Sequence, residues 1–127
     1  MTGEKLFEIA LDLLDLRKTN GELPDNCMDM RTKALNIINI CLAECAPLNN
    51  LLQNRTDNEF LDITGLNENV PCDERLAVSV LPFGVAAYLC CDEDPVLSQL
   101  MESRYRNAYR NMQRASKAKI HPVTEVY

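Results

Sequence analysis

The chain has 127 residues, of which 46% are apolar and 25% are charged, and its formal net charge is −6. This length and composition are typical of one folded domain that buries a core without the help of disulfide bonds. They exclude a chain dominated by low-complexity sequence. The N-terminus lacks the cationic and apolar segments of a secretory signal. We therefore expect the whole chain to be mature and intracellular.

The first predicted helix runs from about Gly3 to Arg17. Thr2 is a suitable N-cap, and apolar residues recur at helical spacing between Leu6 and Leu14. Acidic residues lie between them, so the pattern predicts an amphipathic helix with one buried side.

The second predicted helix is capped by Asp25 or Asn26 and ends near Pro47, with Leu51-Leu52 compatible with an extra turn. Its inward side is formed by apolar residues at helical spacing, namely Met30, Ala34, Ile37, Ile38, Cys41, Leu42 and Cys45. The helical period then disappears from Asn54 to Asp73, where Phe60–Thr64 could form a short strand. Irregular segments of this length are often functional or become ordered against a partner.

The most apolar part of the chain is the 16-residue stretch Leu76–Cys91, which carries no formal charge. It is too short for a membrane span, which needs about 20 apolar residues. Because it is apolar on every side, we expect a buried central helix, capped by Asp73, kinked at Pro82 and surrounded by amphipathic helices.

The last predicted helix starts at Asp94-Pro95 and runs to about Lys117, since aspartate is a good cap and proline suits the first helical turn. Its apolar side comprises Leu97, Leu100, Met101, Tyr105, Ala108 and Met112. The sequence thus predicts an all-α fold: a small four-helix bundle over 1–119, with a long irregular loop between the second and third helices and an extended tail over 120–127.

The six cysteines are Cys27, Cys41, Cys45, Cys72, Cys90 and Cys91, and most of them occupy apolar positions of predicted helices. Cys41 and Cys45 share one helix side, a spacing that suits metal ligands as well as core residues. Zinc normally takes four ligands, and the single histidine, His121, lies in the predicted tail. We expect reduced, buried thiols that pack as small hydrophobic residues, with no metal site.

No set of residues predicts catalysis. The chain has no Gly-rich phosphate loop, no HExxH motif and no serine in a nucleophile elbow. The acidic runs Asp73-Glu74 and Asp92–Asp94 suit the ends of helices. We therefore expect a protein that is not an enzyme and that uses no cofactor and no small-molecule substrate.

Charge is divided unevenly along the chain. Residues 1–103 hold 7 basic and 18 acidic side chains, a balance of −11, whereas residues 104–127 hold 6 basic side chains and Glu125 alone, a balance of +5. At about 100° per residue, four of these cations fall within one narrow arc of the last helix, and the other two flank these four along the chain. The arc consists of Arg106, Arg110, Arg114 and Lys117, and the flanking residues are Arg104 and Lys119.

Two interpretations of this basic arc stay open. It is either a solvated helix surface whose cations suit the C-terminal dipole, or a surface that binds an acidic partner or nucleic acid. On the second interpretation, these six residues form the partner-binding site.

The central and last helices also carry short motifs that resemble a known family. These are Leu81–Leu89 (LPFGVAAYL), Asp92–Pro95 (DEDP) and Tyr105, and the Asn39–Glu44 and Asp62–Pro71 segments fit in the same order. With them, most of residues 1–114 resembles the small head–tail connector (adaptor) proteins of tailed bacteriophages and prophages. The chain departs from that pattern at Phe83, where a tyrosine is expected, and in its six cysteines.

The resemblance implies a non-enzymatic structural protein of virion assembly, located in the bacterial cytoplasm or in the virion. Such a subunit forms a ring with copies of itself beneath the phage portal, extends the channel used in DNA packaging and supports tail proteins. Its partners would be itself, the portal protein and tail proteins, with contact to double-stranded DNA in the channel as a further option and no membrane. The alternative is a nucleic-acid-binding or regulatory helical module that uses the basic last helix.

Overall fold

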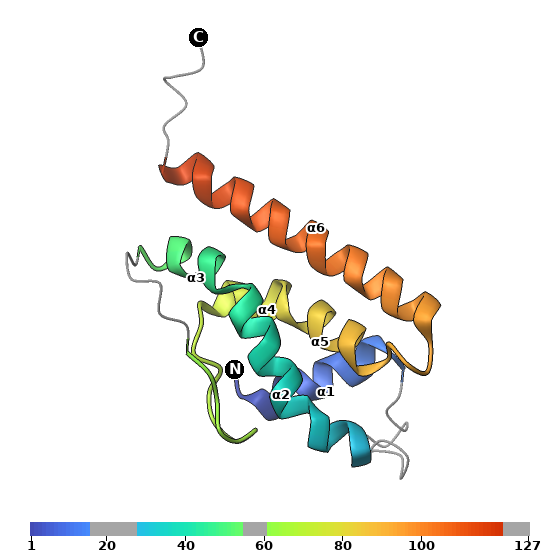
Figure 1. The fold of residues 1–127 in the computed structure, drawn as a ribbon. Helices are drawn as coiled ribbons and strands as arrows, with labels where there is room; N and C mark the ends of the chain where they lie inside the picture. Colours follow the sequence, from blue (N-terminus) through green and yellow to red (C-terminus); the bar gives the residue numbers. More distant parts are fainter. Residues whose placement is uncertain (16–27, 55–60, 121–127) are drawn as a thin grey trace.

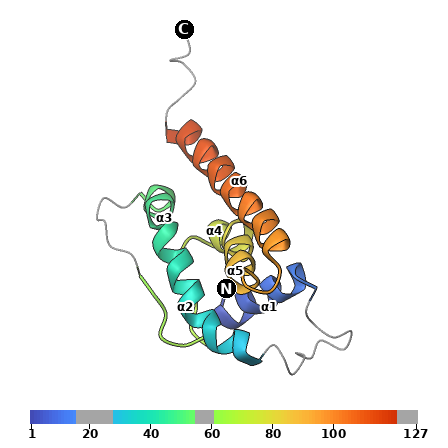
Figure 2. The ribbon, with the colours of Figure 1, turned by 45° about the vertical axis from the view of Figure 1, so that its right-hand side comes forward.

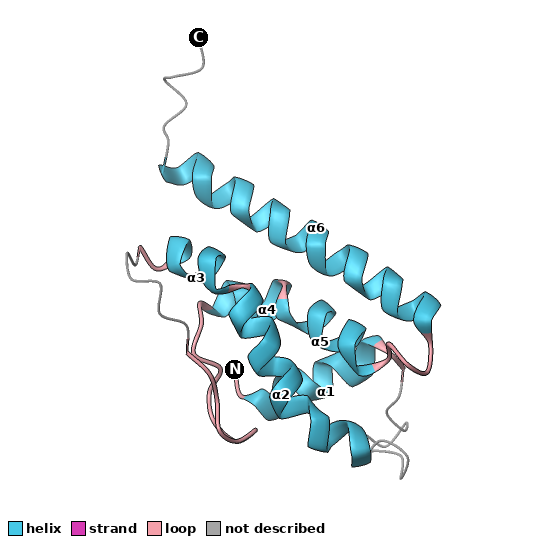
Figure 3. Ribbon diagram, viewed as in Figure 1, coloured by secondary structure: helices cyan, strands magenta, loops and turns pink. Residues whose placement is uncertain are grey.

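The computed structural model describes residues 1–15, 28–54 and 61–120, and helices dominate these segments, with no strand among them (Figures 1 and 3). The helices are α1 (Gly3–Leu13), α2 (Met28–Glu44), α3 (Ala46–Leu52), α4 (Glu74–Ser79), α5 (Leu81–Leu89) and α6 (Pro95–Ile120). This confirms the all-α prediction. The described part has six helices rather than four, because two of the predicted helices are each divided.

α5 is the centre of the fold, as the apolar composition of its segment predicts. It packs against α6, α1, α2 and α4, and almost all of its side chains are buried. The buried residues of this segment include Leu76, Val80, Leu81, Val85 and Ala86, which are all inaccessible to solvent. An apolar helix surrounded by amphipathic neighbours is stabilised mainly by removing this surface from water.

The central segment breaks before Pro82 instead of bending there. α4 ends at Ser79 and α5 begins at Leu81, with Val80 between them at φ −118° and ψ −54°. Pro82 lies in the first turn of α5. Proline lacks an N–H and clashes with the preceding turn, but it is well tolerated where a new helix begins. In place of the predicted kink within one helix, the structure has two helices separated by Val80 alone.

A second break divides the second predicted helix, together with its possible extra turn at Leu51-Leu52, into two helices. α2 ends at Glu44, and α3 begins at Ala46 with Pro47 in its first turn, at an angle of 61° to α2. Pro47 thus starts a helix instead of ending one. The predicted caps Asp25 and Asn26 lie outside the described residues.

α1 is shorter than predicted. Thr2 caps it, since its hydroxyl accepts a hydrogen bond from the backbone N–H of Lys5 at 3.1 Å. The helix ends at Leu13, and Asp15 adopts a left-handed conformation with φ 56°, which is not helical. The end predicted for this helix, Arg17, lies outside the described residues.

The described part of the predicted irregular segment, residues 61–73, is a loop held by side-chain amides (Figure 3). The amide of Asn39 both donates to the carbonyl oxygen of Ile63 and accepts from its N–H, each at 2.9 Å. The Asn49 side chain accepts from the N–H of Asp73 at 2.8 Å. Residues 61–64, the described part of the predicted strand, form no strand. The loop has one isolated antiparallel β-bridge among the described residues, between Thr2 and Asn69.

α6 is a single helix that lies across α5 in its first half and over α3 further along (Figures 1 and 2). Asp94 caps it, since its carboxylate accepts from the N–H of Leu97 at 3.0 Å. Met101 and Tyr105 are buried as predicted, but Leu100 is exposed. The helix includes Ile120, so the tail predicted over 120–127 begins no earlier than residue 121, and 121–127 lie outside the described residues.

Within the segments that the structure describes, no single helix has the length and apolar composition of a membrane span. Taken together, the Met30–Glu44 part of α2 and the whole of α3 are long and apolar enough to pass this test, but the two helices are bent relative to each other. The test considers length and composition alone.

The five cysteines that the structure describes are free thiols, as predicted. Cys41, Cys45 and Cys90 are buried and Cys72 is half-buried. Cys91 is exposed, contrary to the prediction of buried thiols, and Cys27 lies outside the described residues. No group of three or more His, Cys, Asp or Glu residues that could hold a metal ion is present in the described ranges.

Candidate functional site

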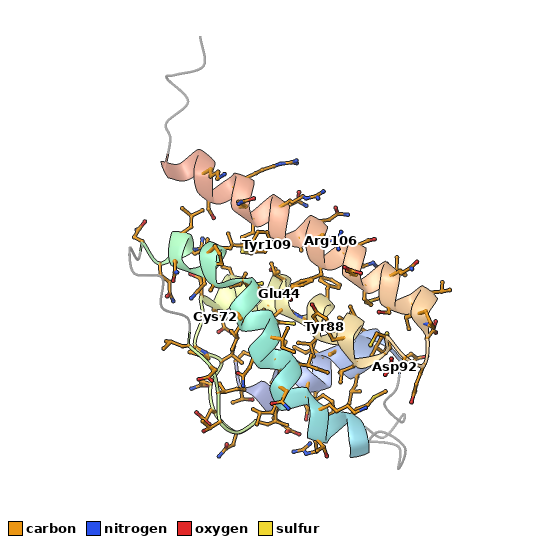
Figure 4. All side chains as sticks on the ribbon, viewed as in Figure 1. Glu44, Cys72, Tyr88, Asp92, Arg106 and Tyr109 are labelled. Carbon is orange, nitrogen blue, oxygen red and sulfur yellow. The ribbon has the colours of Figure 1, made fainter. Side chains whose placement is uncertain are left out.

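A pocket of about 440 Å³ opens between the C-terminal end of α2, the end of α5 and the first half of α6. Figure 4 shows Glu44, Tyr88, Arg106 and Tyr109 gathered in this region from the three helices. Its lining combines aromatic, cationic and acidic side chains, namely Tyr88, Tyr105, Tyr109, Arg106, Arg110, Glu44 and Glu102. The volume is within the usual range for sites that bind a ligand or a partner's side chain.

A hydrogen-bonded chain of side chains forms one wall of the pocket. The hydroxyls of Tyr88 and Tyr105 donate to the two carboxylate oxygens of Glu44, at 2.6 and 3.0 Å. The Cys45 sulfur lies 3.3 Å from the Tyr105 oxygen. Because the single hydroxyl proton of Tyr105 is directed to Glu44, the Cys45 thiol is the donor in that contact.

This network connects α2, α5 and α6 through one carboxylate. Glu44 has no ion pair within the described segments, so the two tyrosine hydroxyls are its stabilising partners there. The bond to Glu44 raises the pKa of Tyr88, and burial raises the pKa of Tyr105, so both hydroxyls stay protonated and able to donate at neutral pH. The arrangement stabilises the packing of the three helices.

The predicted basic arc is divided between two environments. Arg106 and Arg110 line the pocket, whereas Arg114 and Lys117 are exposed further along α6 and do not line it. Arg104 is also exposed, and Lys119 belongs to the last turn of α6. The structure thus brings two of the six predicted site residues together with the tyrosines.

The two pocket arginines differ in their partners. The Arg106 guanidinium is 2.6 Å from a carboxylate oxygen of Glu102, one helical turn earlier. Arg110 has no ion pair or hydrogen bond of its side chain within the described ranges. The two glutamates of the lining balance its two arginines in formal charge, and Arg110 is the pocket cation without an ion pair among the described residues.

Most of the acidic and aromatic residues of this pocket are not evident from the sequence pattern. Glu44 has the pattern of a polar residue at a helix end, and Tyr105 that of a core residue. One signal is present: Tyr88 brings a hydroxyl into an otherwise apolar stretch, and such a hydroxyl normally finds a partner. The identity of that partner depends on packing between helices.

Comparison with known protein families, curated proteins and solved structures finds no match to this chain.

Stability should fall in alkaline solution because of Cys45. Burial raises the pKa of this thiol from 9.0 to about 11. Between these values the thiol is ionised in the unfolded chain but protonated in the folded one, so its contribution is complete below pH 9 and decreases as the pH rises to about 11. The loss is at most about 1.4 kcal/mol per pH unit for this group.

Urea unfolding at pH 8, 9 and 10 measures this slope. Cys45→Ala should unfold with a shallower pH dependence than the parent, and the exposed Cys91→Ala should keep the parental slope. Equal slopes for Cys45→Ala and the parent would show that the Cys45 thiol is not protected by folding.

Proposed function

We propose that this protein is a non-enzymatic assembly subunit that associates with copies of itself into a closed ring, as the phage head–tail connectors that it resembles do. The observation that carries the proposal is the separation of charge within one subunit. The exposed side of α6 bears Arg106, Arg110, Arg114 and Lys117, whereas the balance of residues 1–103 is −11.

A basic helix side on a subunit whose other residues are net acidic favours head-to-tail contact with identical subunits. Such a contact is heterologous and gives a ring when the rotation between neighbours closes. Complementary charges at the contact fix the register and speed the encounter. An assembly subunit of this kind also needs no catalytic residues.

The resemblance supplies the biological setting of the proposal. The ring would lie beneath the portal of a tailed phage or prophage, in the bacterial cytoplasm during assembly and then in the virion. It would bind the portal and tail proteins. The basic side of α6 is assigned to contact between subunits and not to the channel lining. A strongly basic lining would bind the DNA and slow its movement through the channel.

Light scattering over a concentration series, followed by negative-stain imaging of the most concentrated sample, tests the proposal. We expect closed rings of about a dozen subunits, as the resemblance implies, and a mass that decreases as salt screens the contact. A protein that stays monomeric at every concentration would contradict self-assembly.

A nucleic-acid-binding module is the second candidate, favoured by the row of cations on α6. Arg104, Arg110, Arg114 and Lys117 have no ion pair within the described ranges, so they are free to contact phosphates. Binding to duplex DNA would then weaken steeply with salt, and reversing Arg106, Arg110 and Arg114 to glutamate would abolish it. On the assembly proposal, the same triple variant loses self-association instead.

A further inference from the structure

A second hollow, which we call the α6 groove, lies between the C-terminal half of α6, the end of α3 and α4; Figures 1 and 2 show where these helices lie. Its volume is about 410 Å³, and its surface is mostly apolar. The apolar side chains of its lining are Leu52, Ala108, Met112 and Ala115. The first three pack against the core but are only half-buried, and Ala115 is exposed. A segment that covered this lining would remove apolar surface from water, which is favourable.

The α6 groove differs from the pocket of Glu44 and Arg110 in its charge. Among the described residues that line it, the one charged side chain is Arg75. The Nε and Nη2 atoms of Arg75 donate to the Asp73 carboxylate at 3.0 and 3.2 Å. Its Nη1 atom has no hydrogen bond within the described segments, and a guanidinium has donors for a second carboxylate. The groove therefore suits a mostly apolar segment that carries one acidic side chain.

The segment that follows α6 has this composition. Residues 121–127 read HPVTEVY, and Glu125 is the single acidic residue among 104–127. Pro122 lacks the N–H that a helix interior requires, and it biases the residue before it toward an extended backbone. In an extended segment side chains alternate, so Val123, Glu125 and Tyr127 share one side. That side offers an acid between two apolar groups.

The α6 groove is within reach of this segment in the same subunit. Met112 lies eight residues before Ile120, the last residue of α6, which is about 12 Å along the helix axis. Ala108 lies about 18 Å from Ile120 on the same basis. Seven extended residues span about 23 Å, so residues 121–127 are long enough to run back along α6 to the level of Ala108.

Attachment to α6 also favours this segment over other occupants of the groove. A short flexible connection gives the attached segment an effective concentration in the millimolar range. A second copy of the chain reaches such a concentration only in a very concentrated solution. The covering of the groove from within one subunit is therefore the favoured arrangement.

We propose that residues 121–127 fold back along α6 and cover the α6 groove of their own subunit. Val123 and Tyr127 lie against the apolar lining, and Glu125 accepts from the Nη1 atom of Arg75. The segment then connects α6 to α4, and the groove is closed to other partners. This inference goes beyond the proposed self-assembly and does not depend on it.

Photocrosslinking from position 127 of the full chain tests this contact. A benzoylphenylalanine in place of Tyr127 keeps an aromatic side chain and, on irradiation, forms a covalent bond to a neighbouring C–H group. Mass spectrometry of the digested product locates the crosslinked residue. We expect crosslinks to Ala108 or Met112 in chains of monomer mass.

Two pairs of variants, each carrying the same photoreactive residue, test the two parts of the contact. Ala115→Arg places a long side chain over the apolar lining and should lower the crosslink yield about tenfold, whereas Ala43→Arg, at an exposed position of α2, should leave it unchanged. Glu125→Lys opposes Arg75 and should lower the yield, whereas Thr124→Lys adds the same charge on the other side of the segment and should lower it less. Thermal unfolding followed by circular dichroism confirms that the groove variants stay folded.

The other outcomes overturn the inference. Crosslinks only to residues outside the groove, or no crosslinks, would show that residues 121–127 do not cover it. Crosslinks to Ala108 or Met112 that occur only in chains of dimer mass would mean that the segment covers the groove of a second copy. Equal yields in Ala115→Arg and Ala43→Arg would show that the apolar lining does not hold the segment. Each readout is made on dilute monomer, so its failure is distinct from a failure of ring formation.

Discussion

Replacing Ala86 with aspartate is expected to unfold most of the protein at 37 °C. Ala86 is inaccessible to solvent in the centre of α5, which packs against four other helices. An unpaired carboxylate in such a position costs several kcal/mol, out of a total stability of about 5–15 kcal/mol for a typical domain. The neighbouring Ala87 is a less severe position, because it lines the pocket and a charge there could reach water.

Urea unfolding followed by circular dichroism measures the effect of Ala86→Asp. The matched control is Val78→Asp, which places the same charge on α4, where the native side chain is 53% exposed. The control should lose no more than about 1 kcal/mol. If Ala86→Asp unfolded at the same urea concentration as the parent, α5 would not be the centre of the core.

Replacing Gly84 with alanine should destabilise the protein although alanine is the better helix former. A Cβ atom at this position would lie 2.8 Å from the ring of Tyr105, so α5 and α6 cross too closely for a methyl group. The Tyr105 ring cannot move aside freely, because its hydroxyl is bound to Glu44 and contacts Cys45. Overpacking costs about 1–3 kcal/mol, which exceeds the gain of about 1 kcal/mol in helix propensity over most of that range.

Gly65→Ala is the control for this prediction. A Cβ atom there would also lie 2.8 Å from its nearest neighbour, but that neighbour is the side-chain oxygen of Asn67, which can rotate away. We expect its free energy of unfolding to stay within about 0.5 kcal/mol of the parent. If the two variants had the same free energy of unfolding, α6 could shift away from α5 at little cost.

Local sequence chemistry is sufficient to predict the starts of three helices and the buried segment. Thr2 and Asp94 act as the predicted caps, and Asp73 caps α4 by accepting from the N–H of Arg75 at 2.9 Å. These caps depend on residues at most three positions away, so they are visible in the sequence. The burial of most of Leu76–Cys91 follows from its lack of charge, although Val78, Tyr88 and Cys91 are exposed.

The breaks between helices were predicted poorly. Pro47 and Pro82 each disfavour a helix interior and favour a helix start, so the sequence allows a kink, an end or a new helix at the same residue. Packing decides among these. In the structure, both prolines lie in the first turn of a new helix. The loop over 61–73 is likewise positioned by Asn39 and Asn49, each 24 residues away from its partner in the chain.

By itself, the sequence determined that the chain is helical, which segment is buried, and that the cations of α6 share an arc. Only the tertiary structure decided that Arg106 and Arg110 border a pocket, and that Glu44 accepts from Tyr88 and Tyr105, 44 and 61 residues further along the chain. The physical reason is that periodicity specifies the side of a helix on which a residue lies. Which other helix lies against that side is set by the packing of the whole core.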